Sequence, residues 1–274
     1  MFSFSRLTRP QALAVCALPV VALLAVAGLA PLPFAVAQPG GTANVLGEHE
    51  GKPVLTVSGV PTRETEGELR MTTIVATGPQ MDIYLGDVVD GWFRSDRAVM
   101  PKDSVYPVGD DVKEVEKHNL GDMKKSQGAA TDAALRYLKA NGVDDTDKVK
   151  VKADLGKIGG PSAGLFLTLG IIDKVDGDGS GGDLTGGRKI AGTGTITADG
   201  KVGPVGGVAL KTQAARRDGA TVFLVPKDEC SDAQAELPKG LRLVPVTTLT
   251  GTVDALRALE KEEKGGKGGK VPSC

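Results

Sequence analysis

The sequence is poor in histidine: its 274 residues include only His49 and His118. A serine hydrolase of the Ser-His-Asp type needs a histidine as its general base. Neither histidine lies in a segment whose pattern predicts a strand or a well-defined helix end. Any nucleophilic hydrolysis by this chain therefore needs another base, and a lysine with a lowered pKa is the best alternative.

An excess of charge of either sign is also missing, since 33 basic residues balance 34 acidic ones. No overall field draws the chain toward nucleic acid, so we expect no nucleic-acid partner. Asp176 to Gly181 resembles the start of a calcium loop, but the twelfth position is Gly187 instead of the glutamate that such loops use. We expect neither a metal nor any other cofactor.

Charged residues are absent from Pro10 to Gly47, and Ala12 to Ala30 is nearly all apolar, long enough to span a bilayer. Arg6 and Arg9 precede this run, which predicts a cytoplasmic N-terminus and an extracytoplasmic body. We expect a retained single-pass anchor in the cell membrane within residues 1–38. The alternative is a signal peptide, because Ala35-Val36-Ala37 resembles a cleavage site, and the body would then be secreted after cleavage near Ala37.

Cysteine is scarce, with Cys16 inside the apolar run and Cys230 and Cys274 in the body. In an oxidising compartment Cys230 and Cys274 can form a disulfide that fixes the C-terminal tail. The alternative is two free thiols. Neither cysteine lies beside a histidine that would make it a catalytic nucleophile.

Beyond the anchor, strands and helices alternate, which predicts a mixed α and β class, specifically α+β. Residues 87–121 show no clear periodicity and are expected to be irregular, with at most one short helix. Trp92 is expected to be partly buried in the core, and the alternative is an aromatic residue that contacts substrate. We expect a link and entry strand at 39–66, a catalytic body at 67–260, and a mobile glycine-rich tail at 261–274. The expected strands are 68–77, 82–86, 149–155, 190–197, 221–225 and 241–246, and the expected helices are 123–141, 161–173, 208–217 and 252–260.

Ser162 follows Pro161 at the expected first turn of a helix, where unpaired backbone N–H groups stabilise an anion. A serine there is more often a helix cap than a nucleophile. Lys211 favours the nucleophile, because the apolar residues from Gly206 to Leu210 that precede it predict a buried amine. Burial would lower the pKa of this amine toward neutrality. A neutral amine can accept the proton of Ser162.

Two runs together carry a family resemblance: Lys157-Ile158-Gly159-Gly160-Pro161-Ser162-Ala163-Gly164, and Thr193 to Thr197 followed by Gly206 to Lys211. They resemble the two signatures of Lon-type proteolytic domains, and the similarity extends over about 200 residues in family order. The resemblance implies the Lon proteolytic fold, with mixed sheets and packed helices, and an endopeptidase acting on polypeptides. It places the catalytic serine on Ser162, the catalytic lysine on Lys211 and the threonine that steadies the lysine on Thr193, with Gly160, Pro161 and Ala163 in support.

Details of the motif resemble the membrane-anchored bacterial branch, related to proteases that combine PDZ and Lon domains. Cytoplasmic Lon proteins usually have an acidic residue two positions before the proline, whereas this sequence has Gly159 and Gly160 before Pro161. Anchored relatives often insert a PDZ module between the first helix and the strand before the serine, and here only residues 142–148 lie there. No Gly-x-x-x-x-Gly-Lys-[Ser/Thr] loop occurs, so we expect proteolysis without ATP. Lon-type domains often form hexamers, which makes a homo-oligomer plausible. The alternative function is an inactive Lon-fold protein that binds peptides or scaffolds membrane partners.

Overall fold

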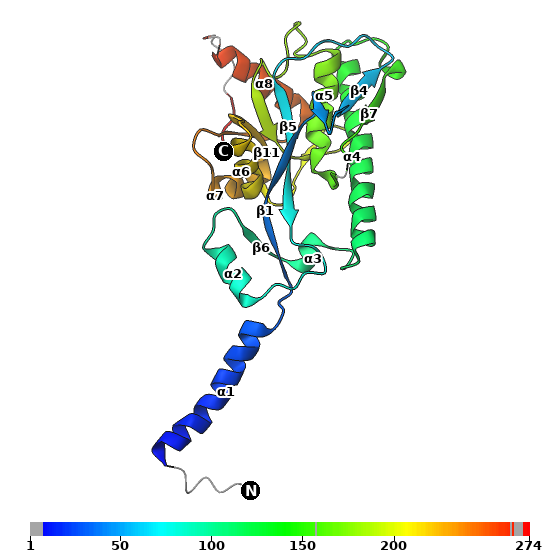
Figure 1. Ribbon diagram of the computed structural model, residues 1–274. Coiled ribbons are helices and arrows are strands. Elements are labelled where there is room, and N and C mark those ends of the chain that lie inside the picture. The colour runs from blue at the N-terminus through cyan, green and yellow to red at the C-terminus, as the bar shows by residue number, and fades with distance from the viewer. Residues whose placement is uncertain (1–7, 157, 264, 266–270) are drawn as a thin grey trace.

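The computed structural model describes residues 8–156, 158–263, 265 and 271–274. Its centre is a twisted six-stranded sheet with helices on both faces (Figure 1). The class is α+β, as the sequence predicts. The strand order is β12-β11-β8-β5-β1-β6, with bounds β1 Phe34–Asn44, β5 Glu68–Ala76, β6 Ala98–Pro101, β8 Lys189–Gly192, β11 Val222–Pro226 and β12 Arg242–Val246.

The sheet is parallel at one side and antiparallel at the other. β5, β8, β11 and β12 run parallel, whereas β1 pairs antiparallel with both β5 and β6. β8 pairs with β5 only along Glu68 to Met71, so the later half of β5 continues beyond it. Pro245 lies in the edge strand β12, a position where a proline can avoid breaking the ladder.

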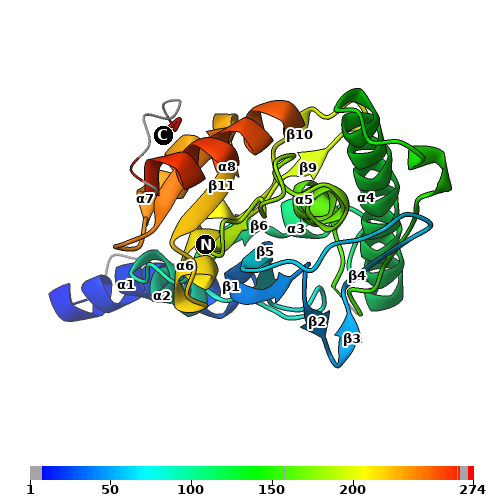
Figure 2. The same ribbon diagram turned by 90° about the horizontal axis from the view of Figure 1, so that it is seen from above.

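One face of the sheet packs against α4 (Val112–Ala140), α5 (Gly164–Val175) and α8 (Leu249–Glu263), and Figure 2 shows these helices from above. Fully buried Phe166, Leu165 and Leu169 of α5 belong to this larger core. The opposite face packs against α6 (Val208–Arg217) and α7 (Cys230–Ala235), with Phe223 at the centre of a smaller core. α5 is buried along nearly its whole length, which explains its almost continuous apolar sequence.

Short elements complete the body. β4 (Leu55–Ser58) pairs with β7 (Lys150–Ala153) beside α5, and two-residue ladders join β2 (Glu48–His49) to β3 (Lys52–Pro53) and β9 (Thr195–Ile196) to β10 (Val202–Gly203). The remaining helices are α2 (Leu85–Trp92), α3 (Lys102–Val105) and the 3-10 turns η2 (Thr146–Lys148), η3 (Pro161–Ala163) and η4 (Lys227–Glu229).

The predicted apolar span forms α1 (Arg9–Leu29), which extends away from the body with no buried residue (Figure 1). It is long and apolar enough to cross a membrane, by length and composition, as an anchor or a signal sequence would be. β1 begins soon afterwards at Phe34 and crosses the predicted boundary at residue 38. Ala35 and Ala37 of the possible cleavage site are buried in the sheet.

Residues 82–121 are more regular than the sequence predicts. The expected strand at 82–86 is wrong, because Ile83 makes only an isolated bridge to Leu32 and α2 begins at Leu85. The expected irregular region contains α2, β6, α3 and the first turns of α4. The prediction of a partly buried Trp92 is also wrong, since 77% of its surface is exposed. Periodicity is a weak guide here because α2, β6 and α3 are only four to eight residues long.

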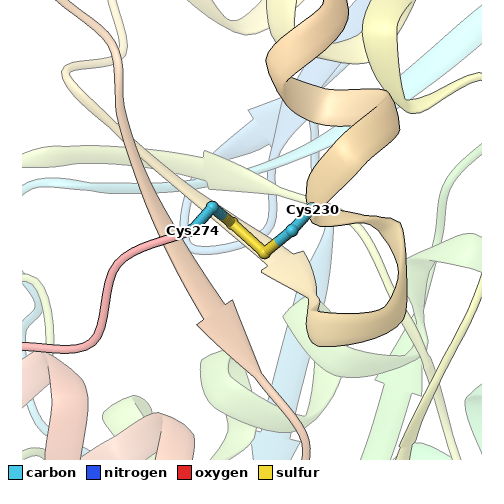
Figure 3. Close-up of a disulfide and its surroundings, with 2 residues drawn as sticks. All are labelled: Cys230 and Cys274. Carbon is cyan, nitrogen blue, oxygen red and sulfur yellow. A yellow bond between two sulfur atoms is a disulfide. The ribbon is translucent and has the colours of Figure 1, made fainter.

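A disulfide joins Cys230 at the start of α7 to Cys274, with the two Cα atoms 5.4 Å apart (Figure 3). Val271 is buried in the larger core, so the described end of the chain packs on the body. Six residues of the tail predicted to be mobile, 264 and 266–270, lie outside the described residues, whereas Lys261 to Glu263 continue α8. Cys16 is exposed on α1 and free.

Candidate active site

Ser162 lies in the 3-10 turn η3, which leads directly into the buried helix α5. The preceding Gly160 has φ 91° and ψ 163°, a conformation that is open essentially only to glycine. Pro161 then starts the turn, where its fixed φ is favourable and its missing N–H is not needed. The Gly-Pro pair therefore presents Ser162 at the N-terminal end of α5.

Helix α4 packs against this turn and forms two hydrogen bonds with it. The Gly160 N–H donates to the Asn119 carbonyl at 3.0 Å, and the Ser126 hydroxyl donates to the Pro161 carbonyl at 3.0 Å. A Cβ added to Gly159 would lie 2.7 Å from the Cβ of Asn119. The double glycine thus has a local steric reason, which is the close approach of the serine turn to α4.

Lys211 lies in the first turns of α6 and is only 4% exposed. Its Nζ donates to Thr193 Oγ1 at 3.1 Å. Thr193 directly follows β8 and is fully buried, and its N–H donates to the Leu224 carbonyl of β11 at 3.2 Å. The sheet therefore fixes the threonine, and the threonine positions the lysine amine.

The same threonine reaches the serine turn. Thr193 Oγ1 donates a long hydrogen bond of 3.4 Å to the Ser162 carbonyl, which also accepts the Gly194 N–H at 3.2 Å. Three segments far apart in sequence, the serine turn, the end of β8 and α6, are thereby joined at one point. The structure thus brings Ser162, Thr193 and Lys211 close together.

Burial lowers the pKa of Lys211 to about 8, because the ammonium form loses its hydration. The negative charge of Glu229 opposes this shift. Burial raises the pKa of Glu229 itself, while its carboxylate accepts the Val205 N–H at 3.0 and 3.1 Å. A lysine in this environment is partly neutral in mildly alkaline solution and can then accept a proton.

A cleft of about 390 Å³ gives access to both Ser162 and Lys211. Ser162, Gly160, Pro161 and Lys211 line it, whereas Ala163 is fully buried and faces the core. No hydrogen bond joins Ser162 Oγ to Lys211 Nζ among the described residues, although both border this cavity. Such bonds are often long before substrate binds. The other lining residues are Thr73, Ile74, Ala76, Met100, Ser104, Val105, Tyr106, Asn119, Gly159, Val205 and Gly206.

A second cavity of about 500 Å³ continues from the first along α4. The two share Thr73, Ile74, Tyr106, Asn119 and Gly159, and the second adds apolar side chains from the start of α4. Neither histidine lines either cavity, and His118 instead contacts Asp122 on α4 at 3.2 Å. In the described part of the chain, no cluster of three His, Cys, Asp or Glu side chains is placed to hold a metal.

Sequence reasoning missed several residues that shape the site. Asn119 and Ser126 were not singled out as supports of the serine turn, and Glu229 was not connected with Lys211. The wall formed by β6 and α3, with Met100, Val105 and Tyr106, came from the region expected to be irregular. Only tertiary packing reveals these roles, because none of these residues belongs to a recognisable local pattern.

Comparison with known proteins supports the reading of both signatures. Residues 111–257 match the sequence profile of the Lon protease (S16) C-terminal proteolytic domain. A Lon protease of Chloroflexus aggregans is 39% identical over 93 residues, covering 32% of this chain and 10% of the relative. Lon protease 1 of Myxococcus xanthus is 33% identical over 111 residues, covering 39% and 13%.

An archaeal Lon protease of Halobacterium salinarum is 28% identical over 121 residues, covering 43% of this chain and 16% of the relative. The chain thus matches only a small part of the length of these relatives. The profile match covers more than half of the chain and includes Ser162, Thr193 and Lys211. The chain belongs to the family of Lon protease (S16) C-terminal proteolytic domains.

Proposed function

We propose that this protein is a membrane-anchored, extracytoplasmic serine endopeptidase in which Ser162 is the nucleophile and Lys211 the general base. The observation that carries the proposal is the buried Lys211, which has a lowered pKa, hydrogen bonds to Thr193 and opens onto the cleft of Ser162. A buried lysine without a carboxylate partner in hydrogen-bond contact destabilises a fold, so its presence favours a catalytic role.

The reaction follows from these positions. Neutral Lys211 accepts the Ser162 proton, and the alkoxide attacks a peptide carbonyl carbon. Backbone N–H groups of the turn at the N-terminal end of α5 stabilise the resulting oxyanion. The Lys211 ammonium then protonates the leaving amine, and a water molecule that Lys211 deprotonates hydrolyses the acyl-enzyme.

Two joined cavities suit an extended, unfolded polypeptide better than a compact ligand. The basic residues before α1 favour an extracytoplasmic body, and the Cys230–Cys274 disulfide suits an oxidising compartment. The 274 residues contain no P-loop motif, and on this we base the proposal that cleavage does not use ATP.

The test is cleavage of an unfolded, cysteine-free protein by the purified chain without nucleotide. Ser162→Ala and Lys211→Ala should each lower turnover by about 10³-fold or more. Ser180→Ala and Lys201→Ala, which change exposed residues of the same types outside the cleft, should leave turnover unchanged. A Ser162→Ala protein with wild-type turnover contradicts the proposal. Peptide binding without cleavage by the wild type would instead identify an inactive, peptide-binding member.

A further inference from the structure

Helix α2 carries a large apolar surface that the body does not cover. Val88 and Gly91 face the body and are buried, whereas Leu85, Val89, Trp92 and the adjacent Phe93 point outward. We call these four residues the outward face of α2. Trp92 is 77% exposed and Phe93 86%, far more than aromatic side chains usually are in water.

The charges of this region do not cover the outward face. Asp87 caps the helix by accepting the Tyr84 N–H at 2.9 Å. Asp90 pairs with Arg97, and Arg94 pairs with Asp96 through two hydrogen bonds of 2.9 Å. The segment therefore combines an apolar face with a nearly neutral polar face, and electrostatic attraction to an anionic partner is weak.

The position of α2 indicates what covers its outward face. The 21 residues of α1 span about 31 Å, which matches a hydrocarbon core of about 30 Å and places Leu29 near its outer edge. The Leu32 N–H donates to the Ile83 carbonyl at 2.7 Å, directly before α2. Three residues span at most about 10 Å, so α2 starts near the interfacial layer.

The contact between the two helices agrees with this placement. α1 contacts α2, and Figure 1 shows α2 beside the end of α1 that joins the body. Met81 and Tyr84, which directly precede α2 in the sequence, are also exposed and add to the apolar surface of this segment. An aromatic-rich helix face at this level fits the headgroup boundary, where tryptophan is enriched.

We infer that the outward face of α2 inserts into the outer lipid–water interface of the membrane that α1 spans. The inference rests on the proposed anchoring by α1 and is independent of the proposed catalysis. α2 leads through β6 into α3, whose Ser104 and Val105 line the cleft. Lipid contact therefore fixes one wall of the active site relative to the membrane surface.

The chain provides its own probe, because Trp92 is its only tryptophan. The full chain is reconstituted in phosphatidylcholine vesicles, with and without lipids brominated in the upper acyl chain, and tryptophan fluorescence is measured. We expect roughly twofold quenching by the brominated lipids, as for a face inserted at the interface. Because the attraction is apolar, raising salt from about 0.1 to about 0.5 M should not change the quenching.

Two variants that each add one carboxylate to an exposed helix surface provide the control. Val89→Glu places it on the outward face of α2 and should abolish most of the quenching. Gly128→Glu places it on α4, at an exposed position where a Cβ meets no atom within 4 Å, and should retain the quenching. Turnover of a soluble substrate checks that both variants fold.

Several results would overturn the inference. One is a lack of quenching of wild-type Trp92 by brominated lipid. Quenching by aqueous iodide would then show that Trp92 faces water, and protection from iodide would show that a second copy of the chain covers it. Another is equal quenching in Val89→Glu and Gly128→Glu. Failure of the wild-type chain to float with vesicles would overturn both the anchoring and the inference, while turnover measured in detergent would still test catalysis separately.

Discussion

At the scale of single residues, the site is organised around a lysine that is kept in an unfavourable environment. Lys211 is buried, its pKa is lowered to about 8, and its amine donates to a neutral threonine hydroxyl. The resemblance to the two Lon signatures implies the roles of Ser162, Thr193 and Lys211. It does not imply the close approach of Gly159 to Asn119 or the effect of the Glu229 charge on Lys211, because both arise from segments distant in sequence.

The pH profile should report this lysine. The proposed mechanism requires the neutral amine of Lys211, so kcat/KM for a peptide substrate should rise with pH and reach half its maximum near pH 8, the pKa of Lys211. Initial rates at low substrate concentration between about pH 6 and pH 10 measure this profile. Activity that is already maximal at pH 6 would contradict the assignment of Lys211 as the base.

Thr193 should act by positioning Lys211. Thr193→Val removes the oxygen that accepts the Nζ hydrogen bond while keeping the side-chain shape, and kcat should fall by about 10- to 100-fold. Thr193→Ser keeps the hydroxyl and should retain most of the activity. Steady-state kinetics of the two variants are compared with their melting temperatures, so that a loss caused by unfolding is recognised.

Replacing the lysine should stabilise the protein as it inactivates it. The pKa of Lys211 is about 8 in the fold against 10.5 as the ordinary value, so the protonated lysine destabilises the fold fully below pH 8. Stability rises as pH increases from 8 toward 10.5, where only the unfolded chain still binds the proton.

Lys211→Met should therefore raise the free energy of unfolding at pH 7 by about 1 to 3 kcal/mol. The lower limit applies if the carboxylate of Glu229, which loses its nearby cation, destabilises the variant. Denaturant titrations at pH 7 and near pH 10 measure the gain, which should shrink at the higher pH. The exposed Lys201→Met serves as the control and should show no such pH dependence. A destabilised Lys211→Met protein would argue against the cost of burial inferred for this lysine.

At the scale of elements, strand β1 links the apolar helix to the body. Long strands and helices with clear periodicity, such as β5, α5 and α6, are predictable within a few residues. β1 is less so, because Pro39 and a pair of glycines interrupt its sequence and the ladder with β5 shifts register there. The boundary predicted at residue 38 therefore places the first half of β1 in the anchor segment, although Phe34 to Ala37 pair with β6 in the sheet.

The register of β1 makes a prediction about truncation. A chain that begins at Gln38 loses every partner of β6, whereas a chain that begins at Pro31 keeps the whole strand. The shorter form should unfold at a lower temperature and lose activity, since β6 supplies Met100 to the cleft. Thermal melts and turnover of the two truncated proteins provide the comparison. Equal stability of the two forms would show that the first half of β1 is dispensable.

At the scale of the whole molecule, the Cys230–Cys274 disulfide closes the C-terminal part of the body. It joins residues 44 positions apart, and both cysteines pack against the smaller core beside α7. The sequence pointed to this pair by elimination, because Cys16 lies in the apolar run. The packing of both cysteines against the smaller core could not be predicted from the sequence, because it depends on how α7 lies on the sheet.

Loss of this disulfide should destabilise the body. Cys274→Ser should lower the free energy of unfolding by about 2 to 4 kcal/mol, the usual range for a loop of this size. Cys16→Ser, which changes the exposed free cysteine of α1, should have no effect. Chemical denaturation measures both variants. Thiol labelling of the denatured wild-type chain should detect Cys16 alone, and labelling of all cysteines would contradict the pairing.

The short connection between α1 and β1 has a consequence for what the enzyme can reach. Only residues 30–33 separate the last turn of the helix from a strand of the central sheet. A protease on a long flexible stalk samples a wide volume. If α1 anchors this protein as proposed, the short connection would instead hold Ser162 at a nearly constant height above the bilayer, and unfolded substrate segments close to the membrane would be cut first.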